Sequence, residues 1–306
     1  MPERFWRFAS SMPAGLALLG MIAAMAALGS FFWPGVFFRS PLFWLLFILL
    51  FVQTTFCGLS NLRRRRRLPR AAALFLIHAG VLLVLIGAAV NATFGLTATL
   101  TLGPGEEQDA AAALGLPGAE PLWLRLESFE ITFYEDGSPS QYLARLSTRA
   151  GEESAAATVS VNHPLSLGGI KIYQQSFGYL FGLRVDGGEA IALRSGERIA
   201  LGAGAALEPY RYIPAFDERA GLDTGRLRPD NPRIVYLVRE AGGEVNTGLA
   251  APGEETQAAG KTVLFESVEM YTVLRLKTDP GLIPAAVGVV MLMAGVCAGF
   301  AARSLR

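Results

Sequence analysis

The sequence predicts a membrane protein with four transmembrane helices, three N-terminal and one C-terminal, and a β-rich extracytoplasmic domain inserted between the third and fourth. Four long runs without Asp, Glu, Lys or Arg predict the helices, because roughly 20 apolar residues cross the hydrocarbon layer. The segment between the third and fourth runs instead alternates apolar and polar residues, which favours β-strands. The charge-free runs are residues 8–38, 40–62, 71–105 and 281–302.

This pattern divides the chain into three regions. The first run is too long for the apolar core of a cleavable signal peptide and is followed promptly by a second, so we expect it to be a membrane anchor. The N-terminal membrane region is predicted at residues 1–95, with spans at about 12–34, 42–60 and 71–92; the extracytoplasmic β-rich domain at 96–278; and the C-terminal transmembrane helix with a short cytoplasmic tail at 279–306.

Arginine residues predict the orientation. Five consecutive arginines, Arg63 to Arg67, and then Arg70 follow the second run. The positive-inside rule places this loop in the cytoplasm, so both termini are cytoplasmic and the β-rich domain lies outside a bacterial inner membrane. The run is tethered between two spans and lacks interleaved aromatic residues. It therefore indicates topology and contact with the lipid bilayer, not nucleic-acid binding.

The inserted segment is predicted to form an antiparallel sandwich or open barrel, because many short strands are separated by Gly, Pro and Asp. Apolar residues alternate in one phase up to Leu126 and in the opposite phase from Phe129, which predicts a bulge near Glu127 and Ser128. Strands are expected at 122–126, 129–133, 142–148, 158–161, 169–174, 180–185, 234–239 and 261–277, and loops at 101–118 and 218–231.

Cysteine placement excludes several chemistries. Cys57 and Cys297 both lie in predicted spans, so the outer domain has no disulfide framework, and the chain has no Cys-x-x-Cys pair. A thiol-disulfide oxidoreductase and a carrier of covalent c-type haem are thereby disfavoured. The sequence also contains no phosphate-binding glycine loop, no His-Glu-x-x-His and no nucleophile elbow.

One of the two histidines, His78, lies inside the third run. A titratable side chain in the hydrocarbon layer is costly, which favours a functional role. His78 follows Ala71 by about seven residues, or roughly 10 Å at 1.5 Å per residue. A low-dielectric setting disfavours imidazolium, so a neutral ring with a lone pair available to a metal is expected. From the residues alone, a structural hydrogen bond to a neighbouring helix is equally consistent.

The third run has two distinct faces when drawn as a helix. Gly80, Val84, Gly87 and Asn91 form a stripe of mostly small residues that is suited to close helix packing. His78 points about 160° away from Gly80, calculated at 100° per residue. We therefore expect one face to pack within the bundle and the other to offer an apolar slot with one nitrogen ligand. The residues expected to line this slot beside His78 are Leu74, Leu82 and Leu85.

Three segments carry a resemblance to a known family. The first begins His78-Ala-Gly-Val-Leu and runs out to Gly-Pro-Gly-Glu106. The second combines Val-Asn-His-Pro-Leu at 161–165 with Tyr-Gln-Gln-Ser at 173–176, and the third covers 271–281 before the last span. In this order and topology they resemble the third span, the Val-Asn-x-Pro-Leu and Tyr-Gln-x-Ser signatures and the final junction of ResB-type (CcsB) proteins of system II cytochrome c biogenesis.

The resemblance implies that the chain handles haem. ResB-type proteins pair with a CcsA/ResC-type integral membrane protein to carry haem b across the membrane and attach it to apocytochrome c. A thioredoxin-like thiol reductase is a further expected partner. The chain would be a non-autonomous subunit of this cytochrome c haem lyase (synthase) complex, and His78 would be an axial ligand of the haem iron. Partners of ResB-type proteins carry a tryptophan-rich outer motif that holds haem for attachment. Here the tryptophans are scattered, so the resemblance assigns attachment to the partner. They are Trp6, Trp33, Trp44 and Trp123.

Asn162, Pro164, Tyr173 and Gln174 of the outer motif are expected to fix a turn and pack the sheet, or to dock apocytochrome or the partner. His163 is expected to have a surface or turn role. Two alternative functions stay open. A membrane-anchored scaffold would dock partner proteins through its β-domain without binding haem. A transporter of another small molecule would be expected to show broken helices or paired inner charges, which the sequence lacks.

Overall fold

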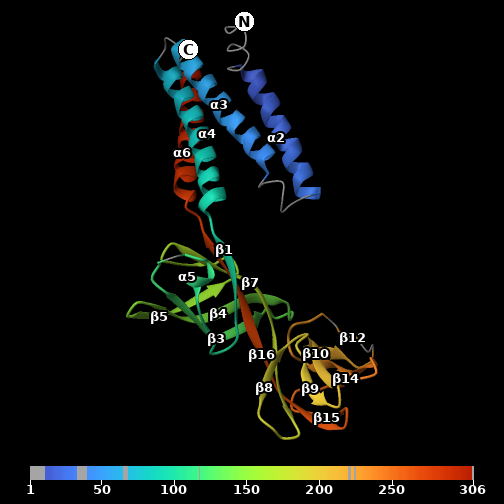
Figure 1. Ribbon diagram of the computed structural model, residues 1–306. Coiled ribbons are helices and arrows are strands. Elements are labelled where there is room, and N and C mark those ends of the chain that lie inside the picture. The colour runs from blue at the N-terminus through green and yellow to red at the C-terminus, as the bar shows by residue number, and fades with distance from the viewer. Residues whose placement is uncertain are drawn as a thin grey trace. The chain divides into compact units, whose positions relative to one another are not determined.

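A computed structural model describes the chain as two compact units (Figure 1). One unit comprises residues 1–95 and 279–306, and the other comprises residues 96–278. The described residues are 11–32, 40–64, 68–116, 118–219, 222–223 and 225–304. Arg65, Arg66 and Arg67 of the arginine run, together with Trp6 and Trp33, lie outside them.

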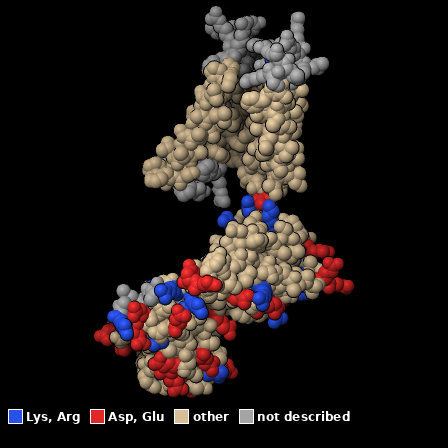
Figure 2. All heavy atoms as spheres, turned by 180° about the vertical axis from the view of Figure 1, so that it is seen from behind, with Lys and Arg blue, Asp and Glu red and all other residues tan. Residues whose placement is uncertain are grey.

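The first unit is helical, and its described residues hold four helices long and apolar enough to cross a membrane. Three of them precede the β-rich unit and one follows it, which confirms the predicted fold class. Figure 2 shows that the visible surface of these helices carries almost no charged side chains, whereas Lys, Arg, Asp and Glu are spread over the β-rich unit. The helices are α2 (Met12–Phe32), α3 (Pro41–Arg64), α4 (Leu68–Phe94) and α6 (Leu282–Ser304).

Helices α4 and α6 pack with their backbones close together. A Cβ atom added at Gly80 would lie 2.6 Å from the carbonyl oxygen of Gly288, and one at Gly87 would lie 2.6 Å from that of Gly281. The helices are therefore antiparallel, and the contact is permitted by Gly80 and Gly87 on α4, by Gly288 on α6 and by Gly281 directly before α6. At the other end, the guanidinium of Arg70 donates to the carbonyl of Ala302 at 3.3 Å. The small-residue stripe predicted for α4 is thus confirmed as its contact face with α6.

The second unit is built from antiparallel strands. Its sheets run β1-β16-β7-β6, with β15 and β8 also paired to β16 and β7; β14-β13-β10-β9; β2-β3-β4-β5; and the hairpin β11-β12. The elements are β1 (Thr97–Leu102), β2 (Glu107–Asp109), α5 (Ala110–Ala113), β3 (Leu122–Phe133), β4 (Pro139–Ala150), β5 (Glu153–Ser160), β6 (Leu165–Leu167), β7 (Ile170–Val185), β8 (Ile191–Arg194), β9 (Ile199–Gly202), β10 (Ala205–Ile213), β11 (Phe216–Asp217), β12 (Leu222–Asp223), β13 (Arg233–Arg239), β14 (Val245–Ala250), β15 (Glu255–Ala258) and β16 (Lys261–Thr278).

Strands β7 and β16 form one long ribbon that contributes to two hydrophobic cores (Figure 1). At one end, Ile172 of β7 and Leu274 of β16 are fully buried with residues of β1, β3 and β4. At the other end, Phe181 and Phe265 are fully buried with residues of β10 and β13. Side chains along each strand point alternately to the two faces of the ribbon, and one face is buried at each end. The ribbon therefore connects the two cores within one unit.

The strand predictions were accurate in some places and wrong in others. The bulge predicted near Glu127 is confirmed by a register shift between Leu126 and Ser128. The separate strands predicted at 169–174 and 180–185 are wrong, because both belong to β7. Gly178, which suggests a break, lies opposite Tyr271 and leaves space for its ring. The loop predicted at 101–118 contains β2 and α5, where the Asp109 carboxylate accepts the Ala111 N–H at 2.9 Å.

Buried Glu208 on β10 is neutralised by two arginines. Its carboxylate accepts from the Nε atoms of Arg198 at 2.7 Å and Arg239 at 3.0 Å. The hydrogen bond from Arg198 is the main cause that lowers the pKa of the Glu208 carboxyl below its ordinary value, and Arg239 adds to the effect. The ionised form is therefore favoured in the folded chain.

We predict that Gly80→Ala destabilises the helical unit by about 1–3 kcal/mol, because the new methyl group must displace the α6 backbone. The matched control is Gly20→Ala in α2, where an added Cβ meets nothing within 4 Å. The control is expected to be neutral or stabilising, since alanine is the better helix former. Thermal unfolding in detergent measures both variants, and equal midpoints would contradict the close contact.

We predict that Glu208 makes stability depend on pH in the acid range. Because its folded pKa is lowered, its contribution is complete above the unfolded value near ~4.3 and is lost as pH falls through the folded value. Glu208→Gln should remove this part of the pH dependence, whereas exposed Glu255→Gln should retain it. Denaturant unfolding at a series of pH values checks the prediction, and parallel curves for wild type and Glu208→Gln would refute it.

Candidate functional site

A pocket between α3 and α4 contains His78. Its volume is about 120 Å³. Most of the lining is aliphatic, aromatic or glycine, and three side chains carry polar atoms: His78, Thr54 and Thr55. An apolar pocket with a few converging polar groups is the usual form of a small-molecule site. The lining residues are Thr54, Thr55, Gly58 and Leu59 from α3, and Phe75, His78, Ala79 and Leu82 from α4.

The imidazole of His78 is oriented by its own helix. Its Nδ1 lies 2.9 Å from the carbonyl oxygen of Leu74, one turn earlier. A carbonyl can only accept, so this contact places the proton on Nδ1 and leaves the lone pair on Nε2. No described residue forms a hydrogen bond with Nε2. The ring is therefore held in the tautomer that can bind a metal through Nε2.

Gly58 on α3 allows the close approach of α3 to His78. A Cβ added at Gly58 would lie 3.1 Å from the Cβ of His78 and 3.3 Å from its Cγ. Any side chain there would press on the imidazole or move the helices apart. One turn earlier on α3, Thr54 is 9% exposed, and the neighbouring Thr55 hydroxyl donates to the carbonyl of Phe51 at 2.8 Å. The lining from α3 is thus compact and only weakly polar.

The structure brings together part of the predicted slot. Leu82 lines the pocket with His78, whereas Leu74 accepts the imidazole hydrogen bond and lines a second pocket with Arg70, between α4 and α6. Leu85 lines neither pocket. Sequence reasoning did not identify the α3 side of the site. A signal was present in Thr54, Thr55 and Gly58, which interrupt an otherwise bulky apolar run, but it did not reveal which helix they face.

The outer motif contains a tight turn. Ser160 and His163 exchange backbone hydrogen bonds of 3.0 and 3.3 Å across Val161 and Asn162. Asn162 has a φ of +66°, the left-handed conformation that asparagine tolerates better than most residues. Exposed His163 places its Nδ1 3.2 Å from the Val161 carbonyl, and Pro164 follows it and precedes β6. These residues form a surface turn.

Gln174 stabilises a bulge in the ribbon. The register shifts between Val273 and Leu274, which leaves Gln175 without a partner on β16. The Gln174 amide donates to the carbonyl of Ser176 at 2.7 Å, across the bulged residue. Its side-chain oxygen accepts from the hydroxyl of Thr272 at 2.7 Å, and Thr272 is fully buried. Tyr173, directly before it, is partly buried and pairs with Arg275.

Two described tryptophans lie in different units. Trp44 is on α3, where its ring packs edge-on against Phe47 with centroids 5.8 Å apart. Trp123 is on β3, where the guanidinium of Arg149 lies 5.3 Å from its ring centroid. Each has a local packing partner. Within the described residues, no group of three or more His, Cys, Asp or Glu side chains converges as in a protein-held metal site.

The fold and the site define a multi-pass membrane protein with a β-rich unit before its last span and a histidine pocket between two spans. Residues 64–264 match the ResB-like family, and the chain belongs to it.

Named relatives agree with this membership. The chain is similar to "Cytochrome c biogenesis protein CcsB" of Synechococcus sp. (strain WH7803), with 28% identity over 258 residues, 80% of this chain and 56% of the relative. It is similar to the proteins of the same name from Gloeobacter violaceus, at 27% over 245 residues, 74% and 50%, and Thermosynechococcus vestitus, at 27% over 271 residues, 80% and 56%. The matches span about half the length of these relatives.

We predict that Gln174→Ala destabilises the β-rich unit by about 1–3 kcal/mol, because it leaves the buried Thr272 hydroxyl without its partner. The matched control is Gln257→Ala, which removes a similar bond to Thr262 on an exposed hairpin and should cost less than about 0.5 kcal/mol. Denaturant unfolding measures both. Equal effects would mean that the Gln174 bond has no special structural role.

Proposed function

We propose that this protein acts in cytochrome c biogenesis as a subunit of a haem lyase complex. In this role it takes part in haem transfer across the membrane and haem attachment to apocytochrome c, together with a CcsA/ResC-type partner. Membership of the ResB-like family supports the proposal. The names of the relatives, "Cytochrome c biogenesis protein CcsB", support the same process.

The observation that carries the haem-binding part is the state of His78. An imidazole whose Nδ1 is bound to the Leu74 carbonyl presents the Nε2 lone pair, which is the donor that haem iron takes from histidine. The surrounding Leu59, Phe75 and Leu82 are apolar, as a porphyrin face requires. Because the site lies within a membrane span, an apolar substrate can reach it without crossing water.

The size of the pocket supports the need for a partner. Sites that enclose a drug-sized ligand measure roughly 300–1,000 Å³, and this one measures about 120 Å³. It can seat the iron-facing part of a macrocycle, while the remainder must be covered by another surface. Phe75 at the pocket is 55% exposed, so one side is open to such a surface. A second axial ligand would then come from the CcsA/ResC-type protein.

We further propose that both termini are cytoplasmic and that the β-rich unit lies outside a bacterial inner membrane. The four candidate spans support this proposal, because with four crossings the two ends are expected on one side and the β-rich unit on the side opposite the loop between α3 and α4. That loop contains Arg65, Arg66 and Arg67, which the positive-inside rule assigns to the cytoplasm. His78 then lies nearer to the cytoplasmic end of α4, where haem would be received.

We predict that His78→Ala, purified with its membrane partner, loses the Soret absorption of bound haem and regains it when imidazole is added. The free imidazole replaces the missing iron ligand in the space left by the side chain. His163→Ala is the matched control and should keep the wild-type haem content, because its ring lies in an exposed turn. Absorption spectra and haem-to-protein ratios measure the result.

A second variant separates ligand loss from misfolding. Gly58→Val keeps His78 but fills the pocket from α3, so haem content should fall without recovery by imidazole. Gly20→Val, where no atom lies within 4 Å of the added Cβ, should bind haem normally. Equal haem in wild type and His78→Ala would instead favour the membrane-anchored scaffold that docks partners through its β-rich unit.

A further inference from the structure

The β-rich unit contains a pocket of its own, which is larger than the His78 pocket and remote from it in sequence. Its volume is about 320 Å³, within the range of ligand-binding sites. Three tyrosines, Tyr179, Tyr210 and Tyr212, line it. The rings of Tyr179 and Tyr212 are tilted by 54° with centroids 4.6 Å apart. Two arginines, Arg211 and Arg226, line the same pocket.

A β-bulge in β10 creates this arrangement. Pro209 pairs with Tyr236 and Arg211 with Val235, so Tyr210 is an extra residue without a partner on β13. In a regular strand, residue 211 would face the opposite side of the sheet from 210 and 212. Here all three consecutive residues line one pocket. Bulges commonly redirect side chains toward functional sites.

Three hydroxyl groups of the lining are available to a ligand. No described residue forms a hydrogen bond with the side chains of Ser195, Tyr210 or Tyr212. Burial raises the pKa of the Tyr212 phenol above its ordinary value, so it remains a neutral donor at physiological pH. Each guanidinium has five N–H donors in a planar fork, so Arg211 and Arg226 can bind a ligand while keeping other contacts.

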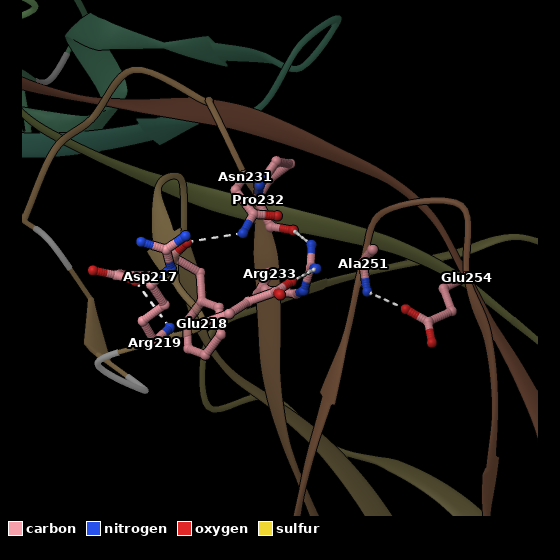
Figure 3. Close-up of polar contacts among 9 residues, drawn as sticks. Asp217, Glu218, Arg219, Asn231, Pro232, Arg233, Ala251 and Glu254 are labelled. Carbon is pink, nitrogen blue, oxygen red and sulfur yellow. Dashed lines mark hydrogen bonds and ion pairs between the residues drawn. The ribbon is translucent and has the colours of Figure 1, made fainter.

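Gly225, Arg226 and Leu227 form one wall of the pocket. Contacts of Glu218, Asn231 and Arg233 hold the chain on either side of this wall (Figure 3). The Phe216 N–H donates to the Asn231 carbonyl at 2.9 Å, and the Asn231 amide donates to the Phe216 carbonyl at 2.8 Å. Beside this bridge, Arg233 donates to Glu218 at 3.0 Å and to the Pro232 carbonyl at 2.9 Å. These contacts join the two ends of the loop to each other and, through Arg233, to β13.

We propose that this pocket binds a carboxylate carried on a planar, ring-bearing apolar group. The tyrosine rings provide stacking surfaces, and the hydroxyls of Tyr210 and Tyr212 can hydrogen-bond the ligand. The guanidinium groups of Arg211 and Arg226 bind the carboxylate, for which their planar geometry is suited. A free aromatic acid and an acidic, aromatic segment of a polypeptide both offer this chemistry. The proposal stands on residues outside the His78 site and does not depend on haem binding there.

The test uses the full-length protein in lipid nanodiscs and two probes. One probe is 2-naphthoate, compared with its uncharged amide, and the other is a terminally blocked peptide of alternating Phe and Glu. We expect at least one probe to bind, with the carboxylate preferred over the amide. Arg211→Gln and Arg226→Gln should each weaken binding about tenfold, the effect of losing one charge-assisted hydrogen bond. Calorimetry or ligand-observed NMR measures the affinities.

Controls distinguish the site from general charge effects. Arg228→Gln removes an arginine of the same loop that does not line the pocket and should bind as wild type. Tyr212→Phe tests the hydroxyl while it keeps the ring. Binding of naphthoate alone identifies a small-molecule site, and binding of the peptide alone identifies a polypeptide site. Absence of binding by both probes, or equal affinity in wild type and both arginine variants, would overturn the proposal.

Discussion

The close contact between α4 and α6 determines which face of α4 can hold a ligand. Where Gly80 and Gly87 meet Gly288 and Gly281, backbone lies against backbone and no side chain fits between the helices. Without a hydrophobic driving force between helices in lipid, such packing is a main source of helix association. His78 lies on another side of α4 from this contact and meets α3. The contact between α4 and α6 thus leaves the His78 side of α4 to meet α3 before any ligand is present.

A small residue also allows close packing on the opposite side of α4. Gly58 lets α3 approach the imidazole, and the Leu74 carbonyl orients the ring from within α4. A histidine that bonded through both nitrogens would only join helices. Here only one nitrogen is used by the described residues, and the residue lines a pocket of about 120 Å³. A small, open site fits the proposed transfer of haem between proteins, because a closed cavity would retain it.

The membrane part of this structure could be predicted from the sequence because its signals are local. Charge-free runs give the helices, and the spacing of Gly80 and Gly87 gives the packing face. The identity of the neighbouring helix is not local, so neither α6 as the partner of that stripe nor Gly58 as the neighbour of His78 could be found. In the β-rich unit, alternation gave the bulge near Glu127 correctly. The separate strands predicted at 169–174 and 180–185 are one strand, in which Gly178 and Gly182 lie opposite Tyr271 and Ser267 across the ribbon.

The bulge at Gln175 in β7 and the bulge at Tyr210 in β10 differ in the contacts around them. At Gln175 the irregular backbone is closed by the amide of Gln174, which also satisfies the buried Thr272. Both polar groups of the Gln174 side chain are thus hydrogen-bonded within the fold. At Tyr210 the bulge leaves three consecutive residues, Tyr210, Arg211 and Tyr212, lining one pocket. This arrangement fits the proposed ligand site, because bulges commonly redirect side chains next to functional sites.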